Sequence, residues 1–88
     1  MTPRGKSDVD GRLARIEGQV RGLRAMVGDD RTAVELLTLV GAVRSAMDSV
    51  ALQVLALHVD DCLRRVARGE DALEQLAAAR EAVARCRG

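Results

Sequence analysis

The stretch from Arg31 to Arg68 constrains the fold of this chain more than any other part. It contains no proline and a single glycine, Gly41. Its apolar residues recur at steps of three and four, the spacing of one helical face: Val40, Val43, Met47, Val50, Val54 and Leu57. Other apolar residues fall at further angles around the same helix, so it must be covered on more than one side. A helix of this length extends about 55 Å, and the rest of an 88-residue chain cannot wrap it. We therefore expect other copies of the chain to cover it.

Two further helices are predicted, one before and one after the long helix in the sequence. The first is amphipathic, with apolar residues in alternating steps of four and three at Val9, Leu13, Ile16, Val20, Leu23 and Val27. Ser7 is the predicted N-cap. The residues before it are polar and include Pro3 and Gly5, so they are not expected to be ordered. The alanine-rich third helix follows Gly69, a glycine suited to end the long helix. The sequence therefore predicts an all-α chain with a flexible tail over 1–6 and one helical domain over 7–88, with helices over about 7–27, 30–68 and 71–86.

Composition limits how the chain can contact nucleic acid. It has no Phe, Tyr or Trp, so it offers no rings on which bases could stack. The net charge is only +1, but between Arg4 and Arg24 six cations stand against three anions. This excess is compatible with a solvated arginine-rich face, or with an ionic contact to nucleic acid that an oligomer would multiply.

The chain carries the features of a cytoplasmic protein. No apolar run approaches the roughly 18 residues of a membrane span, and the first residues lack the apolar segment of a signal peptide. We expect no membrane contact, and we expect both cysteines to be thiols, as is usual in a reducing compartment.

His58 and Cys62 are the strongest candidates for a binding site. They stand four residues apart, so both project from one face of the long helix, close enough to ligate one ion. An imidazole and a thiolate suit Cu(I), Zn(II), Ni(II) or Co(II). Two ligands are too few for a tight site, and the alternative is a half-buried histidine beside a small core cysteine. Cys86 lies about 15 Å further along the helix axis than Cys62 if the third helix folds back at Gly69, and is interpreted as a frayed C-terminal thiol.

Nothing in the sequence indicates catalysis. There is no glycine-rich phosphate-binding loop, because the glycines inside the predicted helices lack a strand and turn around them, and no nucleophile is paired with a base. We therefore predict that the chain is not an enzyme.

The segment Arg12–Leu23, RLARIEGQVRGL, resembles the opening helix of the copper-sensitive operon repressor (CsoR) family, which also includes nickel/cobalt, formaldehyde and persulfide sensors. The resemblance continues over roughly residues 10–67, and includes His58 and Cys62. It implies a three-helix protomer whose first two helices form an antiparallel four-helix bundle in a dimer, with two dimers making a tetramer.

The resemblance also implies a DNA-binding repressor. Members bind operator double-stranded DNA when metal-free and release it when the inducer binds. Their basic residues correspond here to Arg12, Arg15, Arg21 and Arg44. Because the family has no helix-turn-helix, phosphate contacts and DNA shape would supply most of the binding.

One position departs from the copper sensors. By the resemblance, the ion is held by a cysteine near the start of the long helix of one protomer and by a histidine and a cysteine near its end in the other. His58 and Cys62 match the second half, but Ala33 occupies the first. The neighbouring tyrosine and glutamate positions of the family fall on Thr32 and near Ala78. The resemblance thus predicts a repressor with an altered or lost Cu(I) response, binding this or another soft ion weakly.

The same alanine argues against the sister functions, because formaldehyde and persulfide sensing both need the cysteine that Ala33 replaces. The alternative to a repressor is a helical oligomer that does not bind DNA and acts through a paralogue or another protein partner.

Overall fold

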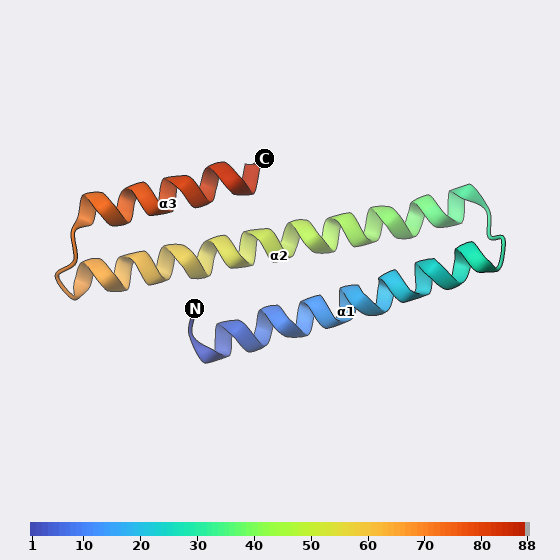
Figure 1. Cartoon of the computed structure of the whole chain (residues 1–88), viewed down its shortest axis with the longest axis horizontal. Coiled ribbons are helices and arrows are strands. Elements are labelled where there is room, and N and C mark those ends of the chain that lie inside the picture. Colours follow the sequence, from blue (N-terminus) through green and yellow to red (C-terminus); the bar gives the residue numbers. More distant parts are fainter. Residues whose placement is uncertain (88) are drawn as a thin grey trace.

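A computed structural model of the chain describes residues 1–87, which form the helices α1 (Pro3–Gly28), α2 (Ala33–Ala67) and α3 (Ala72–Arg87). α1 runs antiparallel to α2, and α3 folds back along the C-terminal part of α2 (Figure 1). Within this part of the chain α2 contacts both other helices, which do not contact each other. The Cα atoms extend over 58 × 26 × 12 Å, so the helices lie side by side in one layer. The prediction of an all-α, three-helix chain is confirmed; Gly88, the last residue of the predicted domain, lies outside the described residues.

The first helix begins earlier than the sequence predicts. The prediction of a flexible tail up to a cap at Ser7 is wrong for residues 3–6, which are helical. Thr2 is the N-cap, and its Oγ1 accepts a hydrogen bond of 3.0 Å from the backbone N–H of Gly5. Pro3 suits the first helical position because its φ is already helical and its missing N–H would have no partner there.

Contacts with α2 hold the start of α1 in place. Gly5 is buried, and a Cβ atom there would lie 2.9 Å from Cδ2 of Leu57, so the absence of a side chain permits the close approach. The N-terminal ammonium of Met1 donates a hydrogen bond of 2.6 Å to Oδ2 of Asp61. This bond lowers the pKa of Asp61, although burial acts in the opposite direction. These contacts join residues far apart in sequence, which is why local signals did not predict them.

The turn between α1 and α2 is also longer than predicted. Asp29 follows the last residue of α1, and Asp30 adopts a left-handed conformation with φ of 54°. Thr32 is the N-cap of α2, and its Oγ1 accepts from the N–H of Glu35 at 3.2 Å. The predicted helix start near residue 30 is therefore too early, because Thr32 and Glu35 have the spacing of a capping box, which begins the helix at Ala33. At its other end α2 is followed by Gly69, also left-handed with φ of 95°.

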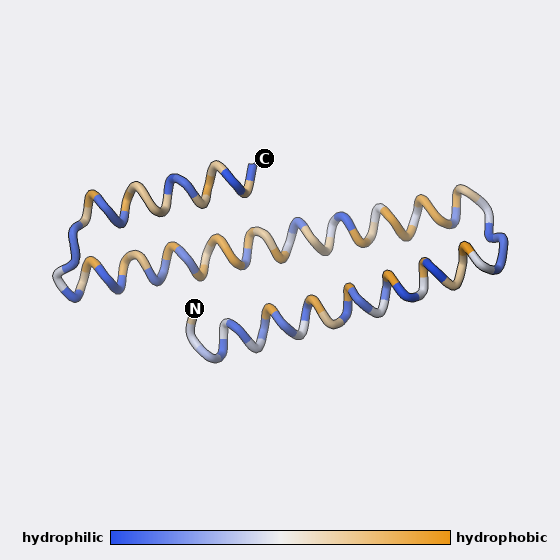
Figure 2. Tube along the Cα trace, viewed as in Figure 1, coloured by the Kyte–Doolittle hydropathy of each residue, from blue (hydrophilic) through white to orange (hydrophobic). Residues whose placement is uncertain are grey.

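The hydrophobic core is small. Val9 and Ile16 of α1 pack with Val50 of α2, and four partly buried residues surround them: Val43, Ala46, Val54 and Leu57. Many large apolar side chains remain exposed, such as Leu37 (66%) and Leu52 (63%). Figure 2 shows apolar positions distributed along all of α2. A single layer of helices therefore leaves much of its apolar surface exposed to water, and a partner chain would bury that surface.

The two faces of the α1–α2 hairpin differ in polarity. Neighbouring positions on an α-helix differ by about 100°, which puts Leu13 and Val20 on one flank of Ile16 and Arg15 on the other. Leu13, Val20 and, by the same geometry, Met47 of α2 share one side of the hairpin, and all three are exposed. We call this the apolar side. The opposite side carries polar residues.

By length and composition alone α2 could cross a membrane, since one 18-residue window has a mean hydropathy of 1.3. The sequence predicts no apolar run of membrane length. The window average is nevertheless high, because a few polar residues change the mean of 18 residues only slightly. Between Glu35 and Asp60 the only charged residues are Arg44 and Asp48, near the middle of that segment. Charges at that depth are costly in a bilayer, whereas a helix covered by protein can keep them at its surface.

Replacing the two competing cap residues separates the observed helix start from the predicted one. Thr2→Ala removes the side-chain acceptor for Gly5 and is expected to lower the free energy of unfolding by about 1 kcal/mol. Ser7→Ala is the matched control. It lies inside the helix, so alanine should leave stability unchanged or raise it slightly. Urea unfolding followed by circular dichroism at one protein concentration measures both, and a greater loss from Ser7→Ala would contradict the assigned cap.

Candidate functional site

His58 and Cys62 lie together near the C-terminal end of α2. The Sγ atom of Cys62 is 3.7 Å from Nε2 of His58. Cys62 is buried and His58 half-buried. The same Nε2 lies 3.3 Å from the backbone carbonyl oxygen of Ala78 on α3. The carbonyl can only accept, so in this arrangement Nε2 carries the proton and donates.

The pair fits half of a metal site. Bonds of about 2.3 Å to sulfur and 2.0 Å to nitrogen, as for Zn(II), leave the two ligand atoms about 3.7 Å apart when the angle at the ion is near 120°. The observed separation of 3.7 Å thus suits one shared ion. A histidine can ligate through either ring nitrogen. An ion on Nε2 would displace the contact with Ala78, whereas an ion on Nδ1 could leave that contact in place. In both cases further ligands must come from elsewhere. Residues 1–87 contain no group of three or more His, Cys, Asp or Glu arranged to hold an ion.

The position expected to supply the other half lies at the far end of α2. Ala33 is the first residue of that helix, and its methyl group cannot ligate. It precedes His58 by 25 residues, or about 37 Å of helix. One chain therefore cannot bring position 33 to its own His58. The hydroxyl of Thr32 is occupied in capping the helix at Glu35.

Ala78 is a contact that sequence reasoning identified only in part. The resemblance placed a family glutamate near this position, and the structure places the backbone carbonyl of Ala78 against His58. The contacting group belongs to the main chain, so residue type carries no signal for it. It joins α3 to the candidate metal centre.

The interpretation of Cys86 as a frayed C-terminal thiol is wrong. It lies within α3 and is half-buried. With His58, Asp61 and several apolar residues it lines a cavity of about 520 Å³ between α2 and α3. Both cysteines are free, in accord with the expectation of thiols.

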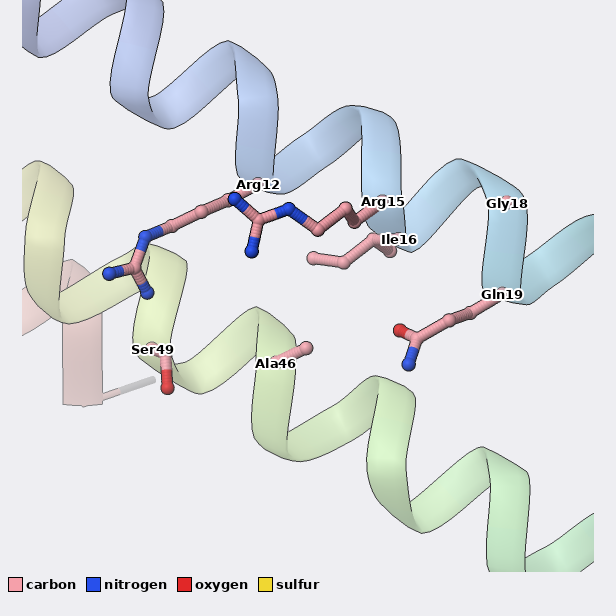
Figure 3. A pocket seen from close by; sticks show the side chains of 7 residues that line it. All are labelled: Arg12, Arg15, Ile16, Gly18, Gln19, Ala46 and Ser49. Atoms are coloured by element: carbon pink, nitrogen blue, oxygen red, sulfur yellow. The ribbon is translucent and has the colours of Figure 1, made fainter.

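The predicted basic residues fall into two groups. Arg12 and Arg15 line a groove of about 600 Å³ between α1 and α2, on the side opposite the apolar one. Figure 3 shows their side chains beside Ser49 of α2. Arg21 is nine residues from Arg12, a rotation of half a turn, and it lines a different groove on α1. Arg44 is exposed on α2 and does not line the groove of Arg12 and Arg15.

Sequence reasoning missed two residues of this groove, Gln19 and Ser49. Gln19 follows Arg12 by seven residues and Arg15 by four, which is the spacing of one helical face. That spacing could have identified Gln19. Ser49 comes from the other helix, so only the pairing of α1 with α2 reveals it.

Comparison with known proteins gives a consistent result. Residues 5–85 match the family model described as metal-sensitive transcriptional repressor. The chain is 42% identical over 74 residues to the copper-sensing transcriptional repressor CsoR of Bacillus subtilis (strain 168), covering 81% of this chain and 73% of that protein. It is 45% identical over 76 residues to the copper-sensing transcriptional repressor RicR of Mycobacterium tuberculosis (strain H37Rv), covering 84% and 79%.

Two solved structures share the fold. The nickel-responsive transcriptional regulator InrS superposes with a TM-score of 0.83 at 39% identity, covering 91% of this chain and 90% of that one. The copper-sensing repressor CsoR with Cu(I) from Geobacillus thermodenitrificans NG80-2 superposes with a TM-score of 0.85 at 28% identity, covering 100% and 92%.

Removing the imidazole of His58, which contacts the carbonyl of Ala78, tests whether this contact helps to hold α3 against α2. His58→Leu replaces the imidazole with an apolar side chain of similar size that cannot donate to the carbonyl of Ala78. Loss of this bond should weaken the docking of α3 by about 1 kcal/mol, and amides in Ala72–Arg87 should exchange with solvent about fivefold faster. Hydrogen exchange read by mass spectrometry measures this, with Ser45→Ala on the same helix as control. Unchanged exchange in α3 would contradict the role.

Proposed function

The chain belongs to the metal-sensitive transcriptional repressor family, and from this premise we propose that it represses transcription by binding operator DNA in its metal-free state, with an altered or lost response to Cu(I). The family consists of repressors rather than enzymes, which confirms the prediction that the chain is not an enzyme. The observation that carries the proposal is the arrangement of α2, with His58 and Cys62 together near one end and Ala33 at the other.

The proposed DNA contacts are Arg12, Arg15, Arg21 and Arg44. Support is strongest for Arg12 and Arg15, which lie together along one groove. Neither forms an ion pair with any residue from 1 to 87, so their charges are available to phosphates. Arg21 and Arg44 are exposed elsewhere on the hairpin and would add to the basic surface of an assembly.

We propose that the working form is a homo-oligomer, in which two α1–α2 hairpins form an antiparallel four-helix bundle and two such dimers form a tetramer. The exposed Leu13, Val20 and Met47 of the apolar side support this, because pairing with a second hairpin would bury them. An assembly would also repeat the basic groove on each protomer. As a regulator of DNA, it would work in the cytoplasm.

The assembly explains how a distant position could complete a metal site. In antiparallel protomers the start of one α2 can lie near the end of another, so that position 33 of one chain approaches His58 and Cys62 of its partner. With Ala33 present, only those two residues would hold Cu(I) or another soft ion. A soft ion bound there would supply a bond to the Cys62 thiolate and to the His58 imidazole.

The second candidate is an interaction protein that does not bind DNA and acts by mixing with a paralogue or another protein. The breadth of the exposed apolar surface favours it, because that surface suits any similar helical hairpin. DNA binding separates the two candidates.

Operator binding and its dependence on salt test the repressor proposal. The purified protein should bind duplex DNA from upstream of its own gene with a steep salt dependence. Arg12→Ala and Arg15→Ala should each weaken binding and reduce the salt slope by about 1 for every chain that contacts DNA. Fluorescence anisotropy at two or more salt concentrations measures this, with Arg80→Ala on α3 as the charge-matched control. If the wild type prefers the upstream duplex no more than a random one at low salt, the repressor proposal fails.

Restoring a cysteine at position 33 tests the metal proposal. The wild type should bind Cu(I) more weakly than a site with two thiolates and an imidazole. Ala33→Cys should tighten binding by roughly 100-fold, the share of one ligand in a typical structural metal site. Adding Cys62→Ser or His58→Leu to this variant should abolish the gain.

Competition with a Cu(I) chelator gives the affinities. The matched control is Val34→Cys, one residue further along α2, where the exposed side chain leaves the helix in another direction. An equal gain from Val34→Cys, or none from Ala33→Cys, would refute the proposed intersubunit position.

A further inference from the structure

The polar side of the α1–α2 hairpin contains a groove whose lining suits an anion. Its walls carry Arg12, Arg15 and Gln19 from α1 and Ser49 from α2, and Ile16 and Ala46 lie between them. Figure 3 shows the polar side chains reaching from α1 toward α2. Among residues 1–87, no Asp or Glu side chain lines this groove. Two fixed positive charges and two neutral donors thus face one space.

The two arginines are available for a ligand. Within residues 1–87 neither takes part in a salt bridge, whereas Arg31, Arg68 and Arg85 each pair with a nearby glutamate. Unpaired guanidinium groups beside a concave, partly apolar wall attract anions more strongly than the same groups on a convex surface.

The groove would remain open when the apolar side is covered. The exposed Leu13 and Val20 lie on one flank of Ile16, and Arg15 and Gln19 lie on the other. A second hairpin that packs on the apolar side therefore does not compete for this groove. The volume of about 600 Å³ is that of a pocket for an organic ligand rather than a single inorganic ion. A phosphodiester with its flanking sugars is of this size.

We propose that this groove binds a phosphodiester segment of the DNA backbone, with Arg12 and Arg15 supplying charge and with Gln19 and Ser49 as additional ligands from two helices. This inference rests on the repressor function proposed above and adds two uncharged contact residues to it. In the free protein the Ser49 hydroxyl donates to the carbonyl of Ser45 at 3.2 Å. Rotation of the hydroxyl redirects the donor to a phosphate oxygen, and the cost is one weak hydrogen bond.

Uncharged contacts leave a distinctive signature in binding experiments. A neutral donor to a phosphate releases no counterion, so its loss lowers affinity without changing the salt slope. It contacts the backbone rather than a base edge, so operator and random duplex should be affected alike. Gln19→Ala and Ser49→Ala are each expected to weaken binding to both duplexes about three- to tenfold at an unchanged slope.

The experiment measures the full-length protein by fluorescence anisotropy with the upstream duplex and a random duplex of equal length, at several salt concentrations. Ser45→Ala, on the same helix but outside the groove, is the control for Ser49→Ala and should bind like the wild type. Gln19→Glu keeps the shape of the side chain and places a carboxylate in the groove, so it should bind more weakly than Gln19→Ala. Arg80→Ala on α3 has the same net charge as Gln19→Glu and should bind nearly as well as the wild type.

The outcomes separate this inference from the function on which it rests. If the wild type binds the upstream duplex and the three groove variants bind no differently from the two controls, the groove is not a phosphodiester site, although the repressor proposal stands. If the wild type binds neither duplex, both proposals fail. Circular dichroism of each variant at the assay concentration shows whether the helices are intact, and Gln19→Glu provides the decisive comparison if Gln19→Ala unfolds.

Discussion

Within residues 1–87, every packing interaction between helices involves α2. α1 and α3 each rest on α2 and, over the described residues, do not contact each other. A helix supported from two directions in one layer still exposes the rest of its circumference. This explains why a chain that is 48% apolar has so few fully covered side chains. The small core, the uncovered apolar side and the open polar groove all follow from that arrangement.

Periodicity in the sequence was sufficient for the helices themselves. The apolar residues at steps of three and four include Val9, Ile16 and Val50, which form the core. They also include Leu13, Val20 and Met47, which a single chain leaves exposed. The ends of the helices were less predictable. The start of α1 depends on Thr2 and on the close approach of Gly5 to Leu57. That second contact crosses more than fifty positions of sequence and has no local signal.

The candidate metal centre and the groove also combine features that the sequence predicted with features that it did not. The spacing of His58 and Cys62 predicted their proximity, and the 3.7 Å between their ligand atoms agrees with it. The contact of His58 with Ala78 could not be read from residue types, since it is made by a carbonyl group. The grouping of Arg12 and Arg15 with Ser49 likewise required the relative position of two helices. Sequence patterns therefore report what one helix presents, and they miss what two helices build together.

The bond from His58 to Ala78 also has a thermodynamic consequence. The ring nitrogen of His58 that lies 3.7 Å from the sulfur of Cys62 is also the one that contacts α3. An ion bound through this nitrogen would compete with the docking of α3 for the same atom. By linkage, the factor by which docking of α3 weakens ion binding at Nε2 would equal the factor by which a bound ion weakens the docking of α3. The position of the C-terminal helix would then depend on whether Nε2 holds an ion, and a mutation that loosens this helix would raise the apparent affinity of Nε2 for that ion.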